Sequence, residues 1–192
     1  MAYLLYDPTL YTSVRSEIDS ALSAGPGGLA ERLESCVQLV SIYNEILRLN
    51  TASASIRAVA ATTDLGDVTL SAGAKVLIPY RQFHFDTKVF GGNASQFDAG
   101  RFLNSGLSKD PSFRPFGGGT TYCSGRYLAK REVLTFLALA LSRYDIELAT
   151  GKPATTQTRF PICDVKMSSL GILPPVAGDD VHVVIRNRVL AA

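Results

Sequence analysis

The sequence predicts a mainly α-helical fold with small antiparallel β-sheets, an α+β class. Apolar residues recur four positions apart after Asp7, an apolar run of helix length follows Arg126, and short β-branched segments lie between them. Of the 192 residues, 46% are hydrophobic, which is enough for a core. The 19 basic and 17 acidic residues nearly balance, so nucleic acid is not expected as a partner.

The first helix is expected to begin at Pro8, because Asp7 can cap its N-terminus and proline suits the first helical position. Its apolar positions fall four apart on one face: Leu10, Val14, Ile18 and Leu22. The proline and glycines of residues 25–28 end it. A second helical stretch is expected over residues 29–49, interrupted near Cys36.

Extended segments follow this second stretch. Residues 55–60 are small and β-branched, as in a strand. Residues 67–70 and 75–78 flank a Ser-Ala-Gly-Ala turn and are expected to pair with each other as a hairpin.

The C-terminal third predicts one long helix and further strands. The helix from Arg126 to about Leu141 is apolar nearly all round, so we expect it to be a core helix of the intact domain. In the 192 residues alone it would lack part of its packing partners and leave a large exposed apolar patch. Residues 144–148 are typical of a strand. Residues 181–185 alternate in polarity and are expected to pair antiparallel with residues 165–171.

Three cysteines, Cys36, Cys123 and Cys163, are too few and too far apart for a disulfide scaffold or a zinc site. A reducing compartment is the simpler interpretation. The chain contains no apolar run long enough to span a bilayer, so no membrane segment is expected in it.

Cys123 ends a glycine-rich stretch, Phe113-Arg-Pro-Phe-Gly-Gly-Gly-Thr-Thr-Tyr-Cys-Ser-Gly-Arg126. The three adjacent glycines let the backbone approach a flat ligand closely and adopt positive φ. The following helix would place Cys123 near a helix N-terminus, where unpaired N–H groups and the helix dipole favour an anion. A cysteine in this position is biased towards the thiolate, the form that binds metal.

This stretch resembles the haem-binding loop of the cytochrome P-450 family, the haem-thiolate monooxygenases. The spacing that carries the resemblance is that of Phe116, Gly119, Cys123 and Gly125. It implies that these four residues bind haem b and that the Cys123 thiolate is the iron ligand. Two positions depart from the commonest family form. Thr121 stands where a basic residue often touches a haem propionate, and Ser124 stands where an apolar residue or proline is usual.

The resemblance also assigns roles upstream of the loop. Glu45 and Arg48 are three apart on one helix face, and in the family this Glu-x-x-Arg pair forms a buried network with a later arginine, here Arg101. Arg57 lies where, in the family, an arginine commonly binds a haem propionate, and a guanidinium group matches a carboxylate. The alternative is that Arg57 is a solvated arginine on a strand. His84 has no second histidine nearby, so structural hydrogen bonding is expected rather than metal binding.

The resemblance covers only the C-terminal portion of the family's domain, so residues 1–192 are interpreted as that portion of a single domain. The helix over the distal haem face, with its acid–alcohol pair, has no counterpart here, and the 192 residues alone are not expected to catalyse monooxygenation. By analogy, a C-terminal hairpin would point residues 168–170 at the substrate.

For the intact parent, the resemblance implies oxygen-dependent hydroxylation of a small apolar organic substrate, with electrons from an NADPH-dependent reductase. One alternative is a haem-thiolate isomerase that rearranges a peroxide without external electrons. Another is a truncated chain without activity. Intact eukaryotic relatives are typically anchored in the endoplasmic reticulum membrane, facing the cytoplasm, but the sequence does not predict where this chain resides.

Overall fold

The computed structural model describes residues 1–25, 28–103, 105–149, 160–166 and 171–189. Its helices are α1 (Ala2–Leu5), α2 (Pro8–Ser23), α3 (Leu29–Glu34), α4 (Val37–Asn50), α5 (Tyr80–His84), α6 (Thr87–Phe90) and α7 (Arg126–Arg143), with 3-10 turns η1 (Leu107–Lys109) and η2 (Gly119–Thr121). Its strands are β1 (Ala54–Ala58), β2 (Thr63–Leu65), β3 (Val68–Leu70), β4 (Lys75–Pro79), β5 (Tyr144–Leu148) and β6 (Val183–Asn187). This mixture confirms the predicted α+β class.

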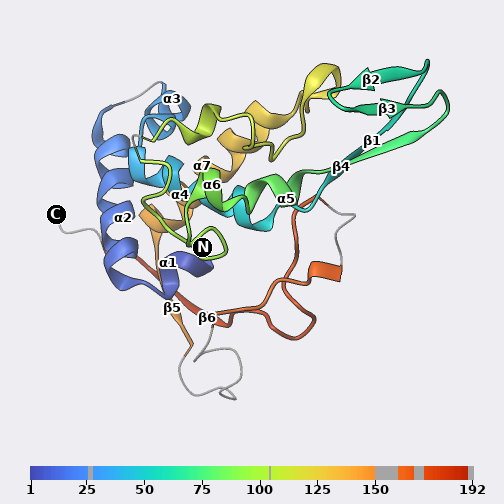
Figure 1. Ribbon diagram of the computed structural model, residues 1–192. Helices are drawn as coiled ribbons and strands as arrows, with labels where there is room; N and C mark the ends of the chain where they lie inside the picture. Colours follow the sequence, from blue (N-terminus) through green and yellow to red (C-terminus); the bar gives the residue numbers. More distant parts are fainter. Residues whose placement is uncertain (26–27, 104, 150–159, 167–170, 190–192) are drawn as a thin grey trace.

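Helices α2, α3, α4 and α7 surround the main core on the left and centre of Figure 1. As predicted, α2 begins at Pro8, and the side chain of Asp7 accepts the N–H of Leu10 at 2.9 Å. The predicted interruption near Cys36 is also present, because α3 ends at Glu34 and α4 begins at Val37. The core is made of apolar side chains from these helices, among them Leu10, Val14, Ile18, Leu33, Leu39, Ile42, Leu134 and Leu141.

The start of α4 is held by a residue of another helix. The carboxylate of Glu17, in α2, accepts the backbone N–H of Gln38 at 3.1 Å and that of Leu39 at 2.9 Å. The N-cap residue Cys36 makes no side-chain capping bond, so Glu17 takes over this role and adds negative charge at the positive end of the helix. The contact fixes α4 against α2, which matters because α4 carries Glu45 and Arg48.

Strands β1 to β4 form an arm that projects to the right of Figure 1. In this arm β1 pairs antiparallel with β4, and β2 pairs antiparallel with β3. The predicted hairpin between residues 67–70 and 75–78 is therefore wrong. The reason is the two-residue turn Gly66-Asp67, where Gly66 has φ +59° and reverses the chain between β2 and β3.

The last strand also pairs differently from the prediction. Strand β5 has the predicted bounds of Tyr144–Leu148, but β6 is its antiparallel partner, and Ile146 lies opposite Ile185. Residues 183–187 thus pair with β5, whereas the expected partner was residues 165–171, of which residues 167–170 lie outside the described part of the chain. Backbone hydrogen bonds extend the β5–β6 ladder beyond both ends, from Ala149 to His182 at 2.9 Å and from Arg188 to Arg143 at 2.8 Å.

Helix α7 begins at Arg126 as predicted, but only one stripe of it is buried. The buried stripe packs against α2, α3 and α4 and consists of Leu134, Leu137, Ala138 and Leu141. The exposed apolar side chains of α7 are Tyr127, Leu128, Val133, Phe136 and Leu139. The helix is therefore not buried all round in the described structure, which confirms the expectation that the 192 residues leave part of it exposed as an apolar patch.

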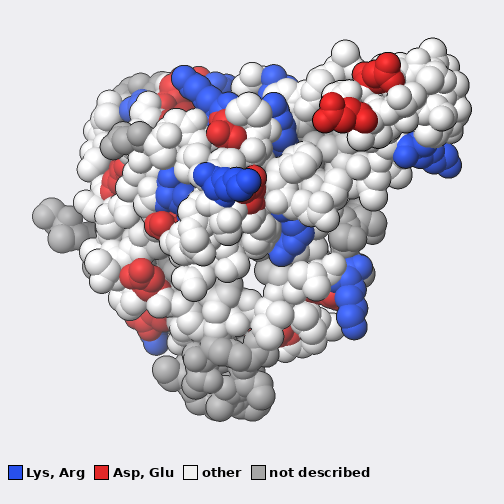
Figure 2. Space-filling view, in the orientation of Figure 1, with Lys and Arg blue, Asp and Glu red and all other residues white. Residues whose placement is uncertain are grey.

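Charged side chains are spread over the surface. On the face in Figure 2, basic and acidic side chains are interspersed rather than gathered into regions of one sign. Among the described residues, no helix is both long enough and apolar enough to cross a membrane.

Candidate functional site

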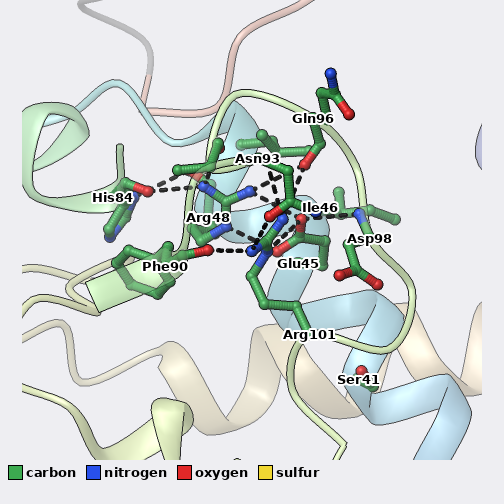
Figure 3. Close-up of polar contacts among 12 residues, drawn as sticks. Ser41, Glu45, Ile46, Arg48, His84, Phe90, Asn93, Gln96, Asp98 and Arg101 are labelled. Carbon is green, nitrogen blue, oxygen red and sulfur yellow. Dashed lines mark hydrogen bonds and ion pairs between the residues drawn. The ribbon is translucent and has the colours of Figure 1, made fainter. Parts of the chain in front are cut away.

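Glu45 and Arg48 of α4 form a doubly hydrogen-bonded ion pair in the interior (Figure 3). The Nε of Arg48 donates to Oε2 of Glu45 at 2.7 Å, and its Nη2 donates to Oε1 at 2.8 Å. Both side chains have 0% of their surface exposed. Arg101 reaches the same carboxylate, with its Nε 3.1 Å from Oε1. The structure thus brings together the three residues of the predicted buried network.

The two guanidinium groups also hold backbone carbonyls of the segment between α5 and Arg101. Arg48 donates to the carbonyls of His84 at 2.7 Å, Ala94 at 2.6 Å and Gln96 at 3.3 Å. Arg101 donates to the carbonyl of Phe90, to the side chain and carbonyl of Asn93, and to the carbonyl of Gln96. The N–H of Asp98 donates to Glu45 at 3.0 Å. Carbonyl or amide oxygens therefore accept seven hydrogen bonds from the two buried guanidinium groups, and the shared carboxylate balances one of their two charges.

The Cys123 loop, in contrast to the buried network, carries its thiol at the surface. Cys123 is exposed, and the loop is closed by a bond from its N–H to the carbonyl of Phe116 at 3.2 Å. Phe116 is half-buried and packs against the main core, which anchors the start of the loop. Gly125 is the N-cap of α7, and a Cβ at that position would lie 3.8 Å from the sulfur of Cys123.

Two glycines of this loop have left-handed backbone. Gly117 has φ +81°, and a Cβ there would lie 3.5 Å from the hydroxyl of Tyr80. Gly119 has φ +67°, and no atom lies within 4 Å of its Cβ position. The loop therefore needs glycine at Gly117 for its shape and its contact with Tyr80, and at Gly119 it leaves open space above the backbone.

Arg57 reaches this loop from β1. Its Nη2 donates to the hydroxyl of Thr121, and its Nη1 donates to the carbonyl of Ile56 at 3.0 Å. The structure thus joins the predicted propionate-binding arginine to the loop position that departs from the commonest family form. The Thr121 side chain, which carries no charge, leaves the Arg57 guanidinium without a neutralising partner in this contact.

Arg57 lines a cavity of about 320 Å³ beside the Cys123 loop, together with Ile78, Tyr80, Phe83, Pro111, Arg114, Gly118, Gly119 and Thr120. A larger cavity of about 780 Å³ lies against residues 52–54 and Phe85, but none of the predicted site residues lines it. Of the predicted site residues, Arg57 and Gly119 line the smaller cavity.

Sequence reasoning missed two residues at this cavity. Arg114 brings a second guanidinium, whose Cδ lies 3.6 Å from the Cβ position of Gly118. Tyr80 packs on Gly117 and shares a hydrogen bond of 2.5 Å with Ser55. An arginine within the glycine-rich motif could have pointed to Arg114, whereas nothing in the local sequence indicates that Tyr80 contacts the loop. The predicted substrate-facing residues 168–170 lie outside the described residues.

Across the described part of the chain, no group of three or more His, Cys, Asp or Glu side chains could hold a metal ion. One thiol supplies one ligand. A metal at Cys123 would therefore need a group that brings its remaining ligands with it, and the open backbone beside Cys123 suits a flat group of this kind.

Comparison with known proteins yields one family. The family model described as cytochrome P450 matches residues 1–171. A cytochrome P450 monooxygenase of Gibberella zeae is 30% identical over 161 residues, which cover 76% of this chain and 31% of the relative. A steroid 17-alpha-hydroxylase/17,20 lyase of Squalus acanthias is 30% identical over 157 residues, covering 79% and 31%.

A self-sufficient cytochrome P450 monooxygenase of Oidiodendron maius is 31% identical over 150 residues, covering 76% of this chain and 14% of the relative. The chain thus spans about a third or less of the length of these relatives.

Proposed function

This chain belongs to the cytochrome P450 family of haem-thiolate monooxygenases, and from that premise we propose that it forms the thiolate-bearing side of a haem site. The observation that carries the proposal is the placement of Cys123. Its thiol is exposed at the end of a glycine loop, two residues before the N-cap of α7, and Arg57 reaches the same loop.

The residues present fit haem. Cys123 would supply the thiolate ligand to iron, and the bare backbone at Gly119 would accept the flat macrocycle. Arg57 would pair with a carboxylate of haem b, because a guanidinium matches a carboxylate in shape and charge. Phe116 would hold the loop on the core, and Gly125, which has no Cβ, would leave the space beside the sulfur free of a side chain.

A thiolate-ligated haem supplies oxygen activation when bound, and that chemistry belongs to the cofactor. This chain's own residues would hold and orient it. The unpaired N–H groups at the start of α7 favour negative charge at the sulfur, and the Arg57 guanidinium would fix the orientation of the ring through its carboxylate. The Glu45, Arg48 and Arg101 network would hold the loop's support rigid.

For the whole protein we propose oxygen-dependent hydroxylation of a small apolar organic substrate. The relatives' names, monooxygenase and steroid hydroxylase, support this class. Electrons would come from NADPH through a reductase, which can be a separate protein or, as the name of the self-sufficient relative suggests, part of the same polypeptide. A haem-thiolate isomerase would instead turn over a peroxide with neither oxygen nor NADPH, so omitting each in turn separates the two activities.

The test of the site is spectroscopic. The chain is loaded with haem, reduced and exposed to carbon monoxide, and the absorption band characteristic of thiolate ligation is measured. Cys123→Ala should abolish this band, because no other residue would supply the sulfur. The matched variants Cys36→Ala and Cys163→Ala should retain it. Retention of the band in Cys123→Ala, with its loss in either of the others, would overturn the assignment.

A further inference from the structure

His84, the last residue of α5, is a buried imidazole that the proposed haem site does not use. It has 0% of its surface exposed, and both ring nitrogens have partners. Its Nε2 accepts the backbone N–H of Arg114 at 2.9 Å. Since a backbone N–H can only donate, Nε2 carries no proton, and the proton lies on Nδ1, which donates to the carbonyl of Arg48 at 3.1 Å.

Burial lowers the pKa of His84 to about 4, helped by the positive charges of Arg48 and Arg81, while the bond to the Arg48 carbonyl acts in the opposite direction. The ring is therefore neutral near pH 7, and its Nε2 is available as an acceptor.

The two partners of His84 belong to the two parts of the site. On one side is Arg48, which also donates from Nη1 to the carbonyl of His84 at 2.7 Å, so the two residues are tied reciprocally. On the other side is Arg114, which is separated by one proline from Phe116, whose carbonyl closes the Cys123 loop. The ring also packs against Phe113, with ring centroids 5.7 Å apart.

We propose that His84 is a positioning residue that sets the place of the Cys123 loop relative to α4. The imidazole is a rigid spacer with a donor at one end and an acceptor at the other, and it joins the buried network to the start of the loop. This role rests on the proposed function, since the position of the loop matters for haem only if Cys123 is the ligand.

Two variants separate the two ends of the spacer. His84→Gln places an amide oxygen near the position of Nε2 and can still accept from Arg114. His84→Asn places its amide near Nδ1 and can still donate to Arg48, but cannot reach Arg114. His182→Asn, at the exposed histidine before β6, is the control.

The first measurement is hydrogen exchange of the Arg114 amide in the haem-free chain. We expect exchange about tenfold faster in His84→Asn than in wild type, and near the wild-type rate in His84→Gln. The second is the thiolate-type band of the haem-loaded, reduced, carbon monoxide-bound protein. His84→Asn should lose a large fraction of it, whereas His84→Gln and His182→Asn should keep it.

Equal loss of the band in both His84 variants, with equal exchange at Arg114, would mean that the ring merely fills space and would overturn the proposal. If wild type itself shows no thiolate band, the proposed haem function fails, while the exchange measurement still decides whether His84 holds the loop. If neither variant folds, nitrogen NMR of wild-type His84 decides: a proton on Nε2 would refute the bond to Arg114.

Discussion

The Glu45–Arg48–Arg101 network and the Cys123 loop are both made of polar groups, yet they are satisfied in opposite ways. Within the network, every charged side chain is at least 95% buried and its partners come from the chain itself. In the loop, the thiol is exposed, and the open space above Gly119 has no protein atom within 4 Å.

The difference separates residues that build the support from residues that meet a ligand. Buried charged groups whose hydrogen bonds are made within the chain have little capacity left for a ligand, and their removal should affect folding. Exposed groups with few internal partners contribute little to folding, and their removal should affect binding. Variants of the buried network should therefore mainly lower the free energy of unfolding, whereas variants of the exposed loop groups should mainly reduce haem ligation.

The largest expected effect on stability is that of Glu45→Ala. Removing this carboxylate leaves Arg48 and Arg101 buried without a counter-charge, which should lower the free energy of unfolding of the haem-free chain by about 3–5 kcal/mol. Cys123→Ala should change it by less than about 0.5 kcal/mol. Urea unfolding followed by circular dichroism measures both.

The matched control is Glu147→Ala, which breaks an exposed ion pair with Arg186 of 2.8 Å. It should cost about 0–1 kcal/mol, because solvent screens the pair. If Glu45→Ala lowers the free energy of unfolding by no more than this control does, the buried ion pairs contribute no more to stability than an exposed one.

The next effect concerns His84, which joins the two regions. Its folded pKa of about 4 lies below the ordinary 6.5, so the unfolded chain binds the additional proton between these values. Its contribution to stability is complete above pH 6.5 and is lost as the pH falls towards 4. The loss should approach about 3 kcal/mol, at ~1.4 kcal/mol per pKa unit.

The measurement is the free energy of unfolding at several pH values for wild type and His84→Gln, because the difference between them cancels the titration of shared carboxylates. A difference that stays constant between pH 7 and 4.5 would contradict the buried neutral state of His84.

A smaller effect is expected within the loop itself. Gly117→Ala places a Cβ on a residue with φ +81° and against the Tyr80 ring, so it should cost about 1–3 kcal/mol. Gly92→Ala is the control, because Gly92 has ordinary φ and open space around its Cβ position. Thermal unfolding of the two variants compares them. Equal melting temperatures would show that the loop tolerates another backbone shape, and that its contact with Tyr80 does not constrain it.

Much of the fold follows from local signals. The Asp7-Pro8 start of α2 and the break near Cys36 are local capping and spacing features, and both were predicted. The pairing of β3 with β2 was not predicted. The sequence offers two turns, Gly66-Asp67 and the longer Ser-Ala-Gly-Ala turn, and does not indicate which of them joins paired strands. The partner of β6 lies about 40 residues upstream, at a distance that alternation cannot reveal.

The candidate site divides in the same way. The Glu-x-x-Arg spacing indicated Glu45 and Arg48, and the glycine loop indicated Cys123. The carbonyl partners of Arg48 and the backbone partner of His84 could not be predicted, because every residue has a backbone carbonyl and N–H, so these groups leave no signal in the sequence. The exposed apolar side of α7 could be predicted, because the helix is apolar nearly all round and the 192 residues supply only part of its packing partners.

The carbonyl contacts of Arg48 and Arg101 also have a consequence for the order of events in time. Residues 91–100 contain no helix or strand, and much of their shape comes from guanidinium groups that collect the carbonyls of Asn93, Ala94 and Gln96. During synthesis α4 leaves the ribosome first, so its arginine is available as a template when this segment emerges. We expect pulsed hydrogen exchange during refolding to protect α4 before residues 91–101, and simultaneous protection would argue against such templating. A segment that is ordered in this way folds only after its template helix has formed.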